Sequence, residues 1–111
     1  MNTNQNMKAL FILANAGFAD EVIEIARKAG ARGATILNAR GEGVHHEVFM
    51  GITLDSEKEM IICVLEDAIS ENVVKAVTEQ AGIKTPAHSV CFSMSIDKVV
   101  GVGMLDLKED K

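Results

Sequence analysis

Short apolar runs alternate along the chain with segments of amphipathic character. Apolar runs rich in strand-forming residues, bounded by Asn, Gly or charged residues, predict β-strands over residues 7–14, 34–39 and 60–65. A fourth short strand is predicted over residues 89–94, and residues 96–102 fit either a turn of helix or a fifth strand. The run 60–65, MIICVL, contains no polar position, which indicates a central, buried strand.

Two segments place apolar residues at helical spacing, with charged residues on the opposite side. The first predicted helix covers residues 18–29 and is followed by Gly30, a residue that commonly ends helices. The second covers residues 67–81 and ends before Gly82, and Ser70 is a candidate N-cap. Both predicted helices directly follow a predicted strand.

The resulting order is β-α-β, a loop, and β-α-β. This order predicts an α+β, ferredoxin-like fold, with a four-stranded antiparallel sheet and two helices on one face. Because successive side chains in a strand point to opposite faces, strongly apolar strands leave apolar side chains on the face without helices. Self-association across that face is therefore expected.

The length of 111 residues and a hydrophobic fraction of 48% indicate a single domain over residues 1–111. Its core is expected over about residues 7–102, with a loop-like segment over residues 44–57 and a charged tail over residues 103–111. Aromatic residues make up only 4% of the chain, so aliphatic residues and Met must fill the core.

Net charge and cysteine content restrict the partners and the compartment. A net charge of −5 and the absence of Tyr and Trp argue against nucleic-acid binding. Cys63 and Cys91 lie in apolar runs and are interpreted as buried, reduced thiols. The first residues lack a basic region, and the following apolar run is too short for a membrane span. We therefore expect a cytoplasmic protein that does not insert into membranes.

Two glycines, Gly41 and Gly43, follow the second predicted strand. Glycines spaced in this way either form a loop whose amides bind an anion, or serve as an ordinary turn. Arg40 offers forked donors that either meet a phosphate or carboxylate, or pair on the surface with Glu42 or Glu47.

The three histidines are candidates for a metal site. His45 and His46 are adjacent, and His88 lies in the turn before the last predicted strand. Imidazoles could bind Zn or Cu, but adjacent histidines in an extended segment point to opposite sides, and exposed loop histidines are the simpler explanation. The serines of the last strand have no His–Asp arrangement beside them, so no catalytic residue and no enzyme are predicted.

The spacing GxTxxxxxGxG, formed by Gly33, Thr35, Gly41 and Gly43, resembles that of the PII signal-transduction (nitrogen regulatory protein P-II) family. The run SVCFSMSIDKVVGV stands where that family has its last core strand and the following turn. The resemblance covers roughly residues 7–102.

The resemblance implies a homotrimer whose inter-subunit clefts bind an adenine nucleotide (ADP, AMP or ATP). A loop after the second strand, the T-loop, would dock onto a membrane transporter or an enzyme. Thr35 would face the adenine and ribose, Ile62 and Val64 would line the base pocket, and a neighbouring subunit's phosphate-binding loop would lie near residues 87–90. The predicted ligand-binding positions are Thr35, Arg40, Gly41, Glu42, Gly43, Ile62, Val64, Ala87, His88 and Ser89.

Departures from the family pattern bear on the ligand. Family members usually have basic residues where this chain has Val44, Val90, Gly101 and Gly103. A triphosphate would lose charge-assisted hydrogen bonds there, which argues against ATP and leaves ADP, AMP, a cyclic nucleotide, bicarbonate or another small anion as the expected ligand. The T-loop-like segment is short and lacks the tyrosine that many members modify. A divergent PII-like sensor is therefore predicted, and a trimeric Zn- or Cu-binding protein using His45, His46 and His88 is the alternative.

Overall fold

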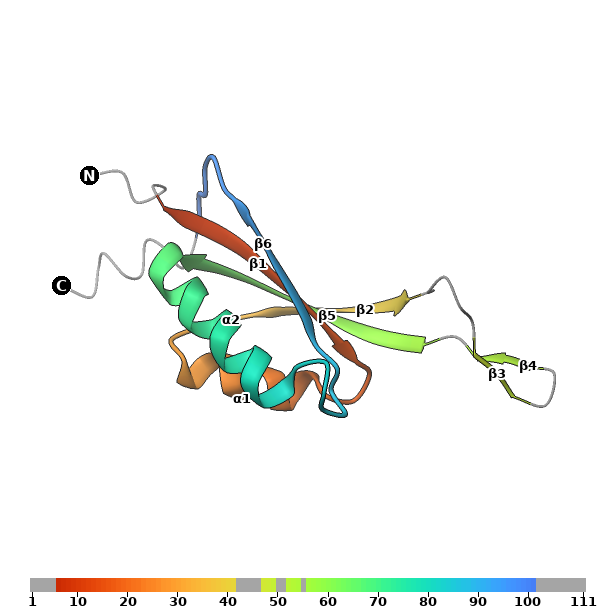
Figure 1. Cartoon of the computed structure of the whole chain (residues 1–111). Helices are drawn as coiled ribbons and strands as arrows, with labels where there is room; N and C mark the ends of the chain where they lie inside the picture. The colour runs from red at the N-terminus through yellow and green to blue at the C-terminus, as the bar shows by residue number, and fades with distance from the viewer. Residues whose placement is uncertain (1–5, 42–46, 50–51, 55, 102–111) are drawn as a thin grey trace.

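The structure is a computed structural model that describes residues 6–41, 47–49, 52–54 and 56–101 (Figure 1). Within these ranges strands and helices alternate as the sequence predicts. The elements are β1 (Met7–Asn15), α1 (Ala19–Lys28), β2 (Thr35–Gly41), β3 (Glu47–Phe49), β4 (Ile52–Leu54), β5 (Ser56–Glu66), α2 (Asp67–Ala81) and β6 (Val90–Ser95).

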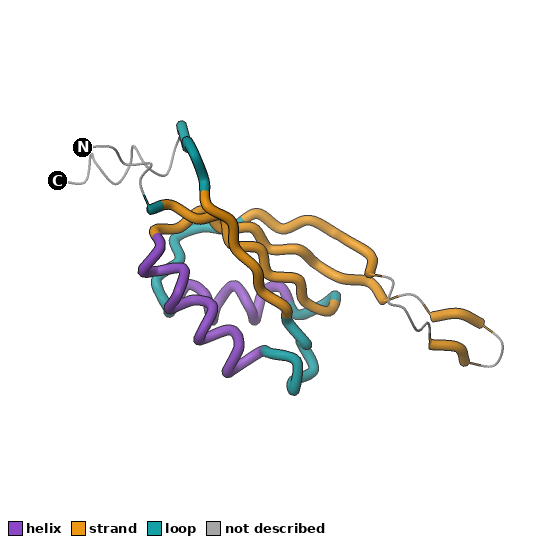
Figure 2. Tube along the Cα trace, turned by 45° about the horizontal axis from the view of Figure 1, so that its top comes forward, coloured by secondary structure: helices purple, strands orange, loops and turns teal. Residues whose placement is uncertain are grey.

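Four strands form one antiparallel sheet in the order β2-β5-β1-β6. Both helices lie on the same face of this sheet, and none of the described residues forms a helix on the opposite face (Figure 2). The predicted ferredoxin-like β-α-β-β-α-β arrangement is confirmed.

The hydrophobic core fills the space between the helices and the covered face of the sheet. Every second residue of the two central strands points into it, as the two-residue period of a strand requires. The fully buried large side chains are Leu10, Ile12, Val22, Ile61, Cys63, Val73 and Val77.

The second helix starts directly after β5, which changes the predicted role of Ser70. Glu66 occupies the N-cap position with extended backbone angles, φ −66° and ψ 152°, and Ser70 is buried inside the helix. The Asp67 amide donates to the Asn6 carbonyl oxygen at 2.7 Å, so the chain before β1 satisfies one of the helix's first N–H groups. The prediction of Ser70 as N-cap is wrong because the chain enters the helix from the strand without a loop.

The segment after β6 forms neither of the two predicted structures. The Ile96 amide donates to the Met7 carbonyl oxygen at 3.2 Å, and residues 97–101 continue without helix or strand. Gly101 has a φ of +139°, a conformation that favours glycine. The chain therefore leaves the sheet at this point.

The predicted T-loop-like segment contains a small antiparallel hairpin of β3 and β4, in which Val48 pairs with Thr53. The hairpin lies beyond the ends of β2 and β5, away from the helices (Figure 1). β5 begins at Ser56, four residues before the predicted strand, because its polar start still pairs with β1 and β2. Neither helix in the described ranges is long and apolar enough to cross a membrane.

Candidate functional site

The face of the sheet opposite the helices, here called the open face, carries a row of four side chains in register. Thr35, Ile62, Phe11 and Phe92 lie side by side across β2, β5, β1 and β6. The rings of Phe11 and Phe92 stack with centroids 5.0 Å apart and planes 7° apart. An aromatic pair thus occupies the part of the open face formed by β1 and β6.

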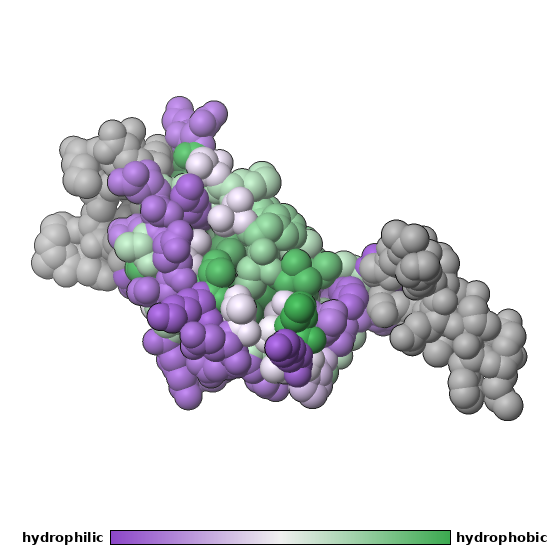
Figure 3. All heavy atoms as spheres, in the orientation of Figure 1, coloured by the Kyte–Doolittle hydropathy of each residue, from purple (hydrophilic) through white to green (hydrophobic). Residues whose placement is uncertain are grey.

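Large apolar side chains extend the open face on both sides of this row. Their exposed fractions lie between 46% and 54%, far above those of the core. They are Leu37, Val64, Val90, Phe92 and Met94. Figure 3 shows apolar residues gathered over β6 and β1, next to the hydrophilic surface of the helices. A contiguous apolar patch of this kind typically marks a surface that contacts another molecule.

The structure brings three predicted site residues together on this face. Thr35 pairs with Ile62 across the β2–β5 ladder, and Val64 lies two residues further along β5 on the same side. Arg40 and Gly41 lie at the other end of β2, opposite Glu57 and Ser56. The apolar residues and the exposed hydroxyl-bearing Thr35 suit a flat, apolar group with polar edges.

His88 belongs to the loop over residues 82–89, which connects α2 to β6. It is exposed and has a φ of +50°, and its amide donates to the Thr85 carbonyl oxygen at 3.0 Å. The ring Nδ1 lies 3.0 Å from the Ile83 carbonyl oxygen. Because a carbonyl only accepts, Nδ1 carries the hydrogen in this contact, which leaves Nε2 as the ring nitrogen outside it.

The residues on either side of His88 are buried. Ala87 lies in the core cluster, and the Ser89 amide donates to the Ala81 carbonyl oxygen at 2.9 Å. The Ser89 hydroxyl is buried and has no hydrogen-bond partner within the described part of the chain. Only His88 of these three predicted site residues presents its side chain to solvent.

The two halves of the predicted site lie at opposite edges of the sheet. β2 forms one edge and carries Thr35 and Arg40, whereas the loop with His88 leads into β6 at the other edge. Two strands, β5 and β1, separate them. One chain therefore does not bring these groups into a single site.

A glutamate that the sequence analysis did not single out organises the start of α1. The Glu59 carboxylate accepts hydrogen bonds from the amides of Gly17, at 3.0 Å, and Ala19, at 3.2 Å. Phe18 at the N-cap supplies no side-chain bond, so a strand residue provides the negative charge that favours a helix N-terminus. Glu59 lies in the polar start of β5, beside Glu57 and Lys58, and nothing in the local sequence indicates this role.

The remaining predicted positions, Glu42, Gly43, His45 and His46, lie outside the described residues. Within the described ranges, no group of three or more His, Cys, Asp or Glu residues is arranged to hold a metal ion. His88 is the described member of the predicted metal set.

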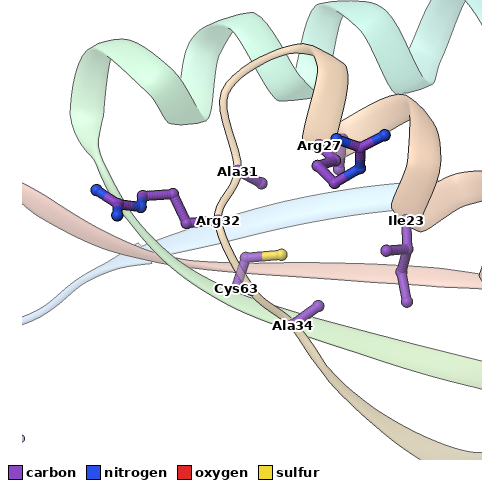
Figure 4. A pocket seen from close by; sticks show the side chains of 8 residues that line it. Ile23, Arg27, Ala31, Arg32, Ala34 and Cys63 are labelled. Carbon is purple, nitrogen blue, oxygen red and sulfur yellow. The ribbon is translucent and has the colours of Figure 1, made fainter. Parts of the chain in front are cut away.

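A small hollow lies between α1, the loop after it and β5 (Figure 4). The Cys63 sulfur points into it, while Arg32 turns its guanidinium away from that sulfur. Its volume of about 40 Å³ suits a water molecule and is far below the roughly 300–1,000 Å³ of ligand pockets. Burial raises the pKa of the Cys63 thiol, which keeps it neutral and unreactive near pH 7.

A second, open hollow of about 300 Å³ lies on the outer side of the helices. Glu21 and Glu24 line it together with Lys28, so two carboxylates oppose the binding of a phosphate there. Neither hollow suits a nucleotide.

The sequence matches one family of known proteins over most of its length. The family model described as nitrogen regulatory protein P-II matches residues 7–103. No curated protein matches the sequence.

Three solved structures resemble the fold at low sequence identity. A putative PII-like signaling protein from Thermus thermophilus is 17% identical, with a TM-score of 0.61, covering 79% of this chain and 84% of its own. A GlnK–ATP complex from B. subtilis is 17% identical, with a TM-score of 0.64 and 81% coverage of both chains. CPII from Thiomonas intermedia K12, a nitrogen regulatory PII-like protein bound to ADP, AMP and bicarbonate, is 18% identical, with a TM-score of 0.63, covering 86% of this chain and 96% of its own.

The family model spans nearly the whole described core, and the solved structures share its strand and helix order. The chain is therefore a signalling protein of the nitrogen regulatory protein P-II family.

Proposed function

We propose that this protein is a homotrimeric sensor that binds an adenine nucleotide, ADP or AMP, in clefts between subunits. Binding would control a partner protein, a membrane transporter or an enzyme, through the segment between β2 and β5. The proposal assigns no catalytic step to any residue.

The observation that carries this proposal is the separation of the predicted ligand residues at the two edges of one sheet. Thr35 and Arg40 lie on the β2 edge, and His88 lies beside the β6 edge. In a ring of copies the β2 edge of one subunit can approach the β6 edge of the next, which is a head-to-tail contact that closes by rotation. A cleft between two subunits would then contain residues from both edges.

The open face supports the assembly part of the proposal. Its large apolar side chains are about half exposed, and covering them with other copies of the chain removes apolar surface from water. Such a face is typical of subunit interfaces.

The relatives support the choice of an adenine nucleotide. The B. subtilis structure is a GlnK–ATP complex, and the Thiomonas protein is bound to ADP, AMP and bicarbonate. Val90, where the family usually has a lysine, is the first residue of β6 and brings no charge to a phosphate. We therefore place ADP and AMP ahead of ATP, and no metal cluster in the described ranges favours the zinc or copper alternative.

Calorimetric titration with ATP, ADP and AMP tests the proposal, using protein whose mass has been measured by light scattering. We expect a mass three times the chain mass of 11.9 kDa and saturable binding of one nucleotide per subunit. The absence of binding heat with all three nucleotides would contradict the proposal that the ligand is an adenine nucleotide. A monomeric mass would contradict the proposal that the binding site lies in clefts between subunits.

Thr35→Val is the variant that tests the site itself, because it removes a hydroxyl while retaining side-chain size. The loss of one hydrogen bond should weaken nucleotide binding by about twofold to tenfold. Thr78→Val is the matched control, since Thr78 is exposed on α2 and is not among the predicted ligand residues. Equal affinities of the two variants would remove Thr35 from the site.

A further inference from the structure

The start of β5 is bonded to the end of β1 through three consecutive residues. The Glu57 carbonyl accepts from the Ala16 amide at 3.0 Å, and the Lys58 ammonium donates to the Asn15 Oδ1 at 2.7 Å. Glu59 then holds the start of α1. The strand segment that follows the β3–β4 hairpin is therefore bonded to residues 15–19 through side chains as well as through its ladder with β1.

Asn15, the last residue of β1, also holds the loop over residues 82–89. Its backbone amide donates to the Ala87 carbonyl oxygen at 2.9 Å, and its side-chain Nδ2 donates to the Pro86 carbonyl oxygen at 2.9 Å. The same carboxamide accepts from Lys58 through Oδ1. One side chain thus joins the loop beside β6 to the start of β5.

The carboxamide of Asn15 suits this position because it donates and accepts at the same time. Aspartate would accept from Lys58 but could not donate to the Pro86 carbonyl, and leucine of similar size could do neither. The lysine bond is partly buried and charge-assisted, and such bonds are stronger than neutral ones.

We propose that Asn15 is a positioning residue that couples the loop over residues 82–89 to the start of β5. A ligand touching His88 changes the freedom of the Pro86 and Ala87 carbonyls, and Asn15 transmits this change to Lys58. The β3–β4 hairpin precedes β5 by one residue in the chain, so the coupling reaches the segment that contacts the partner. The role in signalling rests on the proposed function, whereas the coupling itself does not.

A double-mutant cycle in the absence of ligand tests the coupling by amide hydrogen exchange. The amides of His88 and Ser89 report on the loop, since both donate to backbone carbonyls there. Lys58→Met, which removes the ammonium and retains the stem, should speed their exchange by about twofold to tenfold, as expected for one lost hydrogen bond. In the Asn15→Leu background the same change should have no further effect.

Two further variants separate coupling from general destabilisation. Lys8→Met is the matched control, because Lys8 donates to the Ser95 hydroxyl at the opposite end of β1 and should leave the loop amides unchanged. Asn15→Asp retains the acceptor for Lys58 and loses the donor to the Pro86 carbonyl. The amide exchange rate should therefore rise in the loop and remain unchanged at residues 57–59. The proposal would be overturned if Lys58→Met left the exchange rate of the loop amides unchanged. It would also be overturned if Lys58→Met speeded that exchange equally in the natural and the Asn15→Leu backgrounds.

Titration with ADP then tests the signalling role. In the natural chain ADP should slow exchange both in the loop and at residues 57–59. In Asn15→Leu it should bind within about threefold of the natural affinity and slow exchange in the loop only. If ADP slows exchange at residues 57–59 equally in both proteins, the coupling is overturned. If ADP does not bind the natural chain, the proposed function is overturned, and the double-mutant cycle without ligand decides the coupling.

Discussion

The two faces of the sheet are built from equally apolar residues but differ in what covers them. Leu10, Ile12 and Ile61 on the helix side are fully buried, whereas Phe92 and Val64 on the open face remain about half exposed. The difference arises because both helices pack on one side only. Apolar patterning alone therefore reports how much surface must be buried, and the topology determines whether this chain or another molecule buries it.

The largest expected effect is on the covered face. Ile12→Ala should lower the free energy of unfolding by about 2–5 kcal/mol, because it removes methylene groups and leaves a cavity in a closely packed core. Urea unfolding at one fixed protein concentration measures this value. Ile36→Ala on the edge strand β2, where Ile36 is 42% exposed, should lower the free energy of unfolding by clearly less than Ile12→Ala does. Equal costs would contradict the assignment of Ile12 to the core.

A charge on the open face should break assembly without unfolding the chain. Phe92→Lys places an ammonium beside the Phe11 ring, and desolvating that charge in an interface is unfavourable. Light scattering should give the mass of a single chain, while far-ultraviolet circular dichroism is retained. Thr78→Lys is the control, because Thr78 is exposed on α2, which covers the opposite face of the sheet, and the mass of this variant should not change.

A smaller effect is expected at the cap of α1. Glu59→Gln removes the charge near the helix N-terminus and should lower the free energy of unfolding by about 0.3–1 kcal/mol. Glu71→Gln, at an exposed position of α2 that lies in neither its first nor its last turn, should change it by no more than a few tenths of a kcal/mol, which makes it the matched control. Indistinguishable unfolding curves for the two variants would show that the Glu59 contacts contribute no stability.

The smallest effect concerns the buried Cys63 thiol, since Cys91 is only partly buried, and it appears only at alkaline pH. Burial raises the pKa of Cys63 above the ordinary value of 9.0, so the folded chain keeps the thiol neutral while the unfolded chain ionises it. The stabilisation is complete below the ordinary value and is lost as pH rises through the folded-state pKa. Unfolding at about pH 7 and about pH 9.5 should show a smaller alkaline loss in Cys63→Ala than in the natural chain. An identical alkaline loss of stability in Cys63→Ala and the natural chain would contradict this role of the Cys63 thiol.

The fold was largely predictable because its elements have regular patterns. The bounds of α2 agree with the predicted residues 67–81, and the strand order follows from the β-α-β-β-α-β sequence. The early start of β5 was missed because Glu57, Lys58 and Glu59 are polar and gain their strand conformation from pairing with other strands. The helical or strand structure predicted for residues 96–102 was wrong over the described residues 96–101, since β1, the strand that pairs with β6, begins at Met7, the partner of the Ile96 amide.

The site was less predictable, since its groups meet only in three dimensions. The positions of Thr35 and Ile62 on one face follow from strand alternation, and the ladder agrees. The bonds of Asn15 to the loop over residues 82–89 connect residues about seventy positions apart, and no local pattern indicates them. The ligand-binding and metal-binding assignments of Arg40, Gly41 and the histidines stay predictions.

The stacked rings of Phe11 and Phe92 have an optical consequence. The chain contains no Trp and no Tyr and only four Phe, so these two rings are half of the side chains that supply its aromatic signal in the near ultraviolet. The stacked pair lies on the face that assembly would cover. Aromatic circular dichroism is visible when the rings have fixed surroundings, and the signal disappears when those surroundings are lost. The protein therefore carries an intrinsic optical reporter of its own assembly, with no label attached.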